Sequence, residues 1–412
     1  MASFSVPLSG LQASSSALDV IGNNLANLNT DGYKNQTLSF GDIFSQMQGT
    51  SGNGDPIQIG SGVKIQGTTS NLTNGSVTST GTPANMALQG NGYFVVGNKG
   101  VTSYTRNGDF SVNASGQLTT AGGEQVLGFP AVNGTVSTTG VLAPISVNSN
   151  GTVPAAATSS FQADVNLDSA SAVGNTFSTP LTVYDSLGTA QTLSIQYTKT
   201  GTNSWSYSIS LPGAATGAAA ATTTVASGTL TFDSSGQLTS PSGTVPGINI
   251  TGLADGAANM SLTWNLKGPS GTPTITQQNS ASATTTTTQN GFEVGTLTNY
   301  SVLSDGTVQG QYSNGQTLAL GQVAVANFAN PQGLTQGSGG SQQATSASGA
   351  AVIGQAGVGG NGTISGGAVE QSNVSLSTEF ANMIVAQQSY DANAKVLTTL
   401  NQVDQATMQM IA

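Results

Sequence analysis

The chain has 412 residues, of which only 6% are charged, and its 17 acidic and 7 basic residues give a formal net charge of −10. So few cations cannot supply the basic footprint of a nucleic-acid-binding protein. The absence of His and Cys excludes the usual zinc, haem and iron–sulfur ligands and Ser–His or Cys–His catalysis, so we expect no cofactor and no metal.

The N-terminal segment, "MASFSVPLSGLQASSS", has neither the charged start nor the continuous apolar stretch of a secretory signal peptide. No run in the chain approaches the ~18 apolar residues of a membrane span. We therefore expect no cleaved signal peptide and no direct insertion into a membrane.

A helix is predicted next, because apolar residues recur with the heptad spacing of a coiled-coil seam. Gly32, in "TDGY", is expected to end it in the left-handed conformation. The two rows of the seam are Leu11, Leu18 and Leu25, and Ser14, Ile21 and Leu28.

The same helix is rich in asparagine, with four in the stretch "NNLANLN". Asparagine is a mediocre helix former, since its amide competes for backbone hydrogen bonds. We expect Asn24 and Asn27 to bond neighbouring backbone or amides in the core, and Asn29 to belong to the turn after the helix. The pattern favours a helix that is weak alone and ordered in an assembly.

The middle of the chain is predicted to be β-structure, in short alternating runs separated by Gly, Asn, Asp and Ser. Asn-Gly pairs at 107–108 and 314–315 are hairpin signals. Low-complexity tracts at 211–228 and 279–290 are expected to be loops or boundaries, and another stretch, rich in Gly, Ser and Gln, runs from 336 to 363. Arg106, the only arginine, is expected to bond a carboxylate or carbonyls, and Trp205 and Trp264 to fill a β core.

A second helix is predicted from about 375 to 409, roughly 50 Å long at ~1.5 Å per residue. Glu379 would lie in its first turn, where the helix dipole favours an acid. Its heptad rows are Leu376, Met383, Tyr390 and Leu397, and Phe380, Gln387 and Ala394, and the apolar set then shifts to Leu400, Val403, Thr407 and Met410.

Two interpretations of the terminal helices are open at this point: they pack on a globular core, or they pair with each other and with copies from other subunits. The fold class we expect is mainly β, with an α-helical coiled-coil domain from the two termini and nested, discontinuous β domains of sandwich or barrel type. The predicted division is a helical domain (1–30 and 372–412), a connecting segment (31–75 and 361–371), an inner β domain (76–150 and 291–360) and an inserted outer β domain (151–290).

Particular motifs carry a family resemblance. "ALDVIGNNLANLNTDGYK" and "NVSLSTEFANMIVAQQSYDANAKVLTT" resemble the terminal signatures of the bacterial flagellar axial proteins, which form rod and hook. "GNGYFVV" with "YTRNGDFSVNASGQL" is similar to the first β domain that they share. "LTVYDSLGTAQTLSIQYTKTGTNSWSYSI" resembles the outer domain of the hook members, an insertion that the shorter rod proteins lack.

The resemblance implies a non-enzymatic structural subunit that self-assembles into a curved, flexible tube, a universal joint that transmits motor torque from rod to filament. Implied partners are further copies of the chain, the distal rod protein, the hook cap protein, the hook–filament junction proteins and the flagellar type III export apparatus. Implied localisation is the extracellular flagellum. Phe4 and Leu8 resemble an export motif of the group, although helix packing explains their spacing nearly as well.

The terminal helices would line the tube and contact other subunits. We therefore expect them to be largely disordered in the free monomer and to fold on polymerisation. The predicted interface residues are Leu11, Leu18, Ile21, Leu25, Leu28, Leu376, Phe380, Met383, Tyr390, Leu397, Val403 and Met410.

Alternatives remain open. A distal rod or hook-associated axial protein is the nearest, and a secreted adhesin or surface-layer protein would share the Gly-, Ser- and Thr-rich β composition. A hydrolase with paired carboxylates is a third, although no acidic pair lies in a recognisable motif. The low charge has two explanations: it lets subunits slide between near-equal packings, or it reflects extracellular composition alone.

Overall fold

The structure is a computed structural model that describes residues 4–43, 46–50, 56–98, 100–147, 151–268 and 270–411. The chain divides into two compact units. We call the first the terminal unit (1–148, 299–310 and 317–412) and the second the inserted unit (149–298 and 311–316). Within the described residues, no helix is long and apolar enough to cross a membrane.

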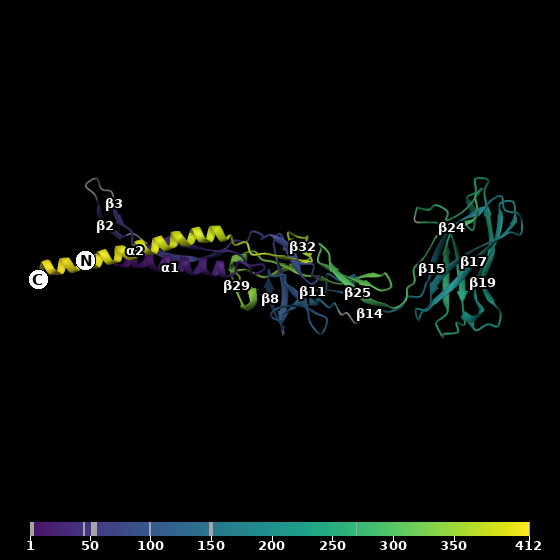
Figure 1. Ribbon diagram of the computed structural model, residues 1–412, viewed down its shortest axis with the longest axis horizontal. Coiled ribbons are helices and arrows are strands. Elements are labelled where there is room, and N and C mark those ends of the chain that lie inside the picture. The colour runs from purple at the N-terminus through teal and green to yellow at the C-terminus, as the bar shows by residue number, and fades with distance from the viewer. Residues whose placement is uncertain are drawn as a thin grey trace. The chain divides into compact units, whose positions relative to one another are not determined.

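The inserted unit is a β-sandwich of two five-stranded sheets around one apolar core (Figure 1). Its long strands alternate buried and exposed residues, as expected where one sheet face packs on the other. Trp205 and Trp264 lie fully inside, which confirms their predicted place. The first sheet contains β15 (Ser160–Asp168), β21 (Thr244–Ile250), β22 (Met260–Asn265), β23 (Ile275–Gln278) and β24 (Ala283–Gln289), and the second β16 (Thr176–Tyr184), β17 (Ala190–Gly201), β18 (Ser204–Pro212), β19 (Thr222–Phe232) and β20 (Leu238–Ser240).

The loop prediction is wrong for parts of two low-complexity tracts. The tract 279–290 contains β24, which pairs with β15 because Thr is a good strand former and its hydroxyls suit the exposed face. The tract 211–228 holds η1 (Gly213–Thr216) and the start of β19. Most of 336–363 is irregular, but it includes η3 (Ser338–Gly340), β30 (Ser341–Gln343) and β31 (Val352–Gly354).

The β-structure of the terminal unit joins strands from the two ends of the chain. Outgoing and returning strands pair directly: β11 with β27, β7 with β28, β8 with β30, β6 with β32 and β5 with β33. The outgoing strands are β5 (Val77–Ser79), β6 (Met86–Gln89), β7 (Tyr93–Asn98), β8 (Val101–Thr105), β9 (Phe110–Val112), β10 (Leu118–Thr120), β11 (Gln125–Val132), β12 (Thr135–Val136) and β13 (Ala143–Pro144). The returning elements are β27 (Thr317–Val323), β28 (Val325–Asn327), η2 (Pro331–Gly333), β29 (Thr335–Gln336), β32 (Thr363–Gly366) and β33 (Ala368–Glu370).

The chain passes between the two units through β25 (Gly295–Val302) and β26 (Thr307–Tyr312), and β14 (Thr152–Val153), in the inserted unit, pairs with β25. Of the two Asn-Gly signals, 314–315 lies in a turn, where Gly315 has φ +77° and its N–H donates to Tyr312. The pair at 107–108 joins β8 to β9, which pair with other strands, so the hairpin prediction is wrong there.

Two helices complete the terminal unit and pack together, which confirms the predicted fold class (Figure 1). They are α1 (Ser5–Ala26) and α2 (Leu376–Ile411). Helix α1 ends earlier than predicted, with Asn27 as its C-cap. Gly32 does adopt the left-handed conformation, at φ +70°, but in the turn that follows, where its N–H donates to the Glu370 carbonyl over 2.7 Å.

The two helices run antiparallel, because Asn24 of α1 lies beside Glu379 and Gly10 beside Asn393. A two-stranded antiparallel ribbon, β1 (Gln36–Asp42) with β4 (Val63–Ser70), also packs on α1. A second ribbon is formed by β2 (Gln46–Thr50) and β3 (Pro56–Ile59). The four-part domain division of the sequence stays a prediction.

Candidate assembly site at the paired chain ends

Small and polar residues form the contact between α1 and α2. Ala13, Ser14 and Ile21 are buried on α1, and Ala386 on α2. A Cβ on Gly10 would lie 2.7 Å from the Asn393 amide nitrogen, so the helix backbones approach closely at this level. The two chain ends therefore meet through small residues and through Ser14 and Ile21 of the second predicted heptad row, whereas the row Leu11, Leu18 and Leu25 is half-buried.

The predicted interface residues lie mostly outside this contact. On α1, only Ile21 of the five is buried, and Leu11, Leu18, Leu25 and Leu28 are half-buried. On α2, Met383 and Leu397 are half-buried, whereas the others are exposed: Leu376 (46%), Phe380 (49%), Tyr390 (41%), Val403 (53%) and Met410 (80%). Phe4 and Leu8, of the predicted export motif, are also exposed.

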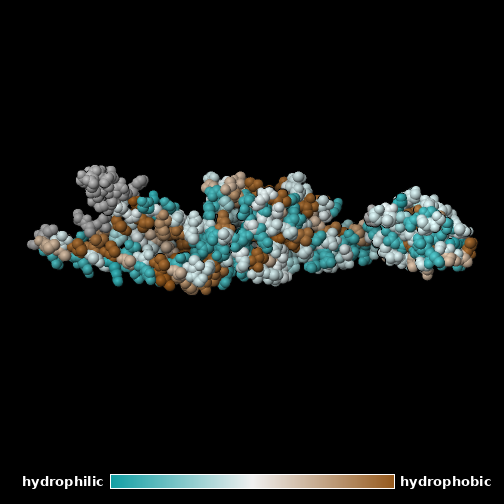
Figure 2. All heavy atoms as spheres, turned by 90° about the horizontal axis from the view of Figure 1, so that it is seen from above, coloured by the Kyte–Doolittle hydropathy of each residue, from teal (hydrophilic) through white to brown (hydrophobic). Residues whose placement is uncertain are grey.

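Many apolar side chains of the helix pair are exposed. Ile384, Val385 and Val396 are among them, and Figure 2 shows hydrophobic side chains along the helical part of the molecule. Exposed apolar side chains gathered on one element favour an interaction site. Contact of these residues with another subunit is a prediction.

A groove of about 590 Å³ runs between the helix pair and the β1–β4 ribbon. We call it the helix groove and define it by Ala17, Ile21, Leu38, Phe40, Val63 and Val385, all of which line it. Phe40 and Val385 are themselves 43% and 62% exposed. The groove is thus an open apolar surface on one side of the helix pair.

Asn24 is the polar centre of the helix contact and is only 1% exposed. Its amide nitrogen donates to the Gln36 carbonyl over 2.8 Å and to Glu379 Oε2 over 3.4 Å. Its oxygen accepts from the Gln36 N–H and from the Tyr33 hydroxyl, at 3.0 and 3.1 Å. This asparagine therefore joins α1, the turn after it and α2 within one chain, and its predicted contacts in the core of an assembly stay a prediction.

Asn27 lies at the end of α1, and its predicted contacts in the core of an assembly stay a prediction. Its amide does bond a neighbouring backbone and amide, both on Asn23, at 2.9 and 3.1 Å. These bonds lie at the surface, however, because the helix ends there and Asn27 caps it. Asn29 is exposed in the following turn.

Glu379 is buried in the first turn of α2. Besides Asn24, it accepts from the Asn35 amide over 2.7 Å. Burial, and secondarily this carboxylate, raise the pKa of Tyr33 above its ordinary value. The dipole argument placed this acid at the helix start, but its partners on the other chain end were not predicted.

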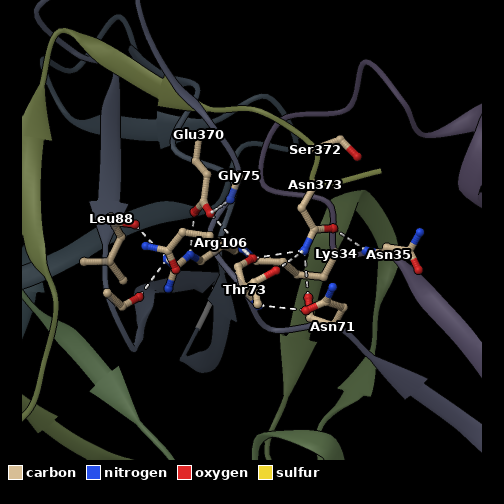
Figure 3. Close-up of polar contacts among 12 residues, drawn as sticks. Lys34, Asn35, Asn71, Thr73, Gly75, Leu88, Arg106, Glu370, Ser372 and Asn373 are labelled. Atoms are coloured by element: carbon tan, nitrogen blue, oxygen red, sulfur yellow. Dashed lines mark hydrogen bonds and ion pairs between the residues drawn. The ribbon is translucent and has the colours of Figure 1, made fainter. Parts of the chain in front are cut away.

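A buried ion-pair cluster lies where the helices meet the β-structure (Figure 3). We call it the Glu370 cluster: Lys34, Arg106 and Glu370. The Glu370 carboxylate accepts from Lys34 Nζ at 2.7 Å, from Arg106 Nε at 2.6 Å and from the Gly75 N–H at 2.8 Å. Burial lowers the pKa of Lys34 below its ordinary value, against the opposing effect of Glu370.

Arg106 is fully engaged in this cluster. Its guanidinium also donates to the carbonyls of Leu88, Gly90 and Gly92, at 2.7 to 2.8 Å. The prediction that the only arginine bonds a carboxylate and carbonyls is confirmed. Its partner Glu370, which stands in "GGAVEQSNV", carries no recognisable sequence signal.

Asn373 ties the two chain ends together beside the cluster (Figure 3). Its oxygen accepts from the Asn35 N–H over 2.7 Å, and its amide donates to the carbonyls of Asn71 and Thr73 at 2.9 and 3.0 Å. The chain leaving α1 and the chain entering α2 are thereby fixed to each other. No group of three or more acidic residues among those described could hold a metal ion.

Four family models match this chain, and their order follows the fold. They are "Flagella basal body rod protein" (5–34), "Flagellar hook protein FlgE/F/G D1 domain" (87–155), "Flagellar basal body protein FlaE D2 domain" (146–292) and "Flagellar basal body rod FlgEFG protein C-terminal" (365–410). Together with the paired terminal helices, they define a flagellar axial protein with an inserted β domain.

Comparison with related proteins shows which flagellar axial proteins this chain resembles. The flagellar hook protein FlgE of Escherichia coli is 37% identical, with 97% of this chain and 98% of the relative covered. That of Treponema pallidum is 32% identical, with 95% and 96% covered. The chain therefore belongs to the flagellar hook protein FlgE family and is a structural subunit of the flagellar hook.

A solved structure agrees with the fold. The crystal structure of Helicobacter pylori flagellar hook protein FlgE2 covers 70% of this chain and 98% of its own, with a TM-score of 0.52 and 14% identity. At that identity the likeness shows the fold alone.

Proposed function

We propose that this chain polymerises into a curved hook tube through the exposed apolar residues of α1 and α2. One observation carries the proposal. Among the described side chains of α2, only Glu379 and Ala386 are buried within the chain. A 36-residue helix gains too little from such contacts to be stable, because helices in water depend on burying an apolar face.

Burial against other copies would supply the missing free energy, at ~25 cal/mol per Å² of apolar surface. Polymerisation would then order the chain ends, which are disordered in the free monomer. The four-part domain division fits this account, with the helical domain (1–30 and 372–412) lining the tube. Export through the flagellar type III apparatus without a cleaved signal peptide, and docking to rod, cap and junction proteins, belong to the same proposal.

The tube would act as a universal joint, without enzymatic activity. Its low charge supports this mechanical role, because strong ion pairs between subunits would fix one packing. The two ion pairs found among the described residues both involve the buried Glu370. Surface contacts are thus left to amides, hydroxyls and backbone, which permit sliding between near-equal packings.

Phe380→Asp tests the proposal, with Val173→Asp, at a 69% exposed site of the inserted unit, as the matched control. We expect electron microscopy of the purified parent and control chains to show curved tubes, and Phe380→Asp to give none at the same concentration. Normal tubes from Phe380→Asp would contradict assembly through α2. Straight, short cylinders from the parent chain would favour a rod component instead.

A further inference from the structure

The end of α2 extends beyond the helix that it packs against. Asn24 lies beside Glu379 and Gly10 beside Asn393. Continuing that antiparallel register places Ser5, the first residue of α1, near residue 398 of α2. The rest of the helix, which we call the free end (399–411), projects past α1 by about a dozen residues, or ~18 Å.

The free end carries an apolar row with no partner in the described part of the chain. Val403 and Met410 are 53% and 80% exposed. They lie within ~20° of each other around the helix, at ~100° per residue, so they form one ridge. Asp404 is the only charged residue of the free end. Such a ridge is suited to an apolar surface that also lacks free charge.

The helix groove is such a surface. Its six defining residues are apolar, and Phe40 and Val385 leave its face open. Its single acidic neighbour, Glu379, is already bonded by Asn24 and Asn35. Side chains of a ridge could enter the groove as knobs enter holes in a coiled coil.

A copy of the chain cannot fill its own groove with its own free end. Asn393 lines the groove, and Val403 lies ten residues further along one continuous helix, ~15 Å away along the axis. The ridge and the groove are therefore different surfaces of one chain that can meet only between copies. A contact of this heterologous kind generates an open helical filament wherever its rotation does not close a ring.

We propose that the free end of α2 in one copy docks its Val403–Met410 ridge in the helix groove of the next copy. This rests on the proposed polymerisation and specifies a contact that propagates it. Each subunit added to the tube would cover one groove and present another.

The chain contains no cysteine, so engineered cysteines test the contact directly. Chains carrying Val403→Cys and Phe40→Cys are mixed, polymerised and oxidised, and linked peptides are quantified by mass spectrometry. We expect the disulfide between positions 403 and 40 at least tenfold above a control mixture of Val403→Cys with Val173→Cys. We expect it only in polymer, since a disulfide requires Cα atoms within ~7 Å.

The results of the cysteine experiment distinguish a failure of the docking contact from a failure of the proposed polymerisation. Chains that form no polymer contradict both. Polymer in which Val403→Cys links to Phe40→Cys no better than to the Val173→Cys control overturns the docking alone. So does preferential linkage of Phe40→Cys to Leu8→Cys, which would assign the groove to α1 of a neighbour.

A second measurement uses two methionines of the free end. Met410 lies on the ridge, whereas Met408 lies ~140° around the helix from Val403, and both are exposed. We expect Met410→Ala to raise the critical concentration for polymerisation about tenfold, and Met408→Ala by less than threefold. Equal effects would contradict a contact through the Val403–Met410 ridge.

Discussion

Arg106 Nε donates to Glu370 Oε2 over 2.6 Å, and this bond joins two residues that are far apart in the sequence. Arg106 directly follows β8, and Glu370 is the last residue of β33, with residues 371–375 between it and the start of α2. Both side chains are buried. The bond thus fixes the base of the helix pair to the β-structure of the terminal unit.

Glu370→Gln should destabilise the terminal unit by about 3 to 5 kcal/mol, because it leaves the charges of Arg106 and Lys34 buried without a counter-ion. Both tryptophans lie in the inserted unit. Tryptophan fluorescence therefore follows the urea unfolding of that unit alone, whereas circular dichroism follows the unfolding of both units. We expect only the dichroism transition to shift. Glu293→Gln, at an exposed site, is the control, and an equal shift for both variants would contradict the role of Glu370.

Asn24→Ala should cost about 2 to 4 kcal/mol, since it leaves the Gln36 backbone and part of Glu379 buried without partners. Asn27→Ala, at the surface cap, should cost about 0.5 kcal/mol, in line with other exposed hydrogen bonds. Because α1 and α2 are expected to be ordered only in the polymer, the measurement is the free energy of unfolding of the polymerised chain, followed by circular dichroism. Equal losses of unfolding free energy in the two variants would show that the buried hydrogen bonds of Asn24 contribute no more than the surface cap at Asn27.

Gly32→Ala should destabilise more than Gly81→Ala. The two glycines have nearly the same left-handed φ, +70° and +71°, so the backbone strain of ~1 kcal/mol is common to both. A Cβ on Gly32 would lie 2.6 Å from the Arg106 backbone, whereas one on Gly81 meets nothing within 4 Å. We expect a difference of at least ~2 kcal/mol in unfolding free energy, and no difference would refute the close approach.

Tyr197→Phe should stabilise the inserted unit by about 1 kcal/mol, because the buried hydroxyl has no hydrogen-bond partner among the residues that the structure describes. Burial also raises the pKa of Tyr197 far above its ordinary value. Above pH ~10 the unfolded chain therefore loses a proton that the folded chain keeps, so stability falls as pH rises, by up to ~1.4 kcal/mol per pH unit.

The measurement for Tyr197→Phe is urea unfolding by tryptophan fluorescence at pH 7, 10 and 11. The variant should lose less stability than the parent chain between pH 10 and 11. Tyr184→Phe, at a half-buried position of the same unit, is the control. A parent-like alkaline slope in the Tyr197→Phe variant would contradict the assignment.

The elements themselves were largely predictable from residue patterns. Heptads located both helices, alternation located the sandwich strands, and the dipole argument placed Glu379 in the first turn of α2. The Thr-rich composition of 279–290 led to a wrong loop prediction. The segment forms a strand because a neighbouring strand, β15, is available to pair with it. Such pairing is set by tertiary context, which local propensity does not contain.

The polar contacts between the chain ends were less predictable. Lys34 and Glu370 are separated by 336 positions, and nothing in either local sequence indicates the other. The heptad rule found the buried row with Ser14 and Ile21, but it did not indicate that the helix backbones approach closely at Gly10. The leucines and aromatics are thereby left for a different partner, which is what polymerisation requires.

Amide hydrogen exchange, compared between monomer and polymer, tests the central claim most directly. The account predicts that amides of α1 and α2 exchange within seconds in the monomer and at least a hundredfold more slowly in the polymer, whereas the inserted-unit strands β15 to β19 exchange equally in both. Helices already protected in the monomer, with no further protection in the polymer, would contradict it.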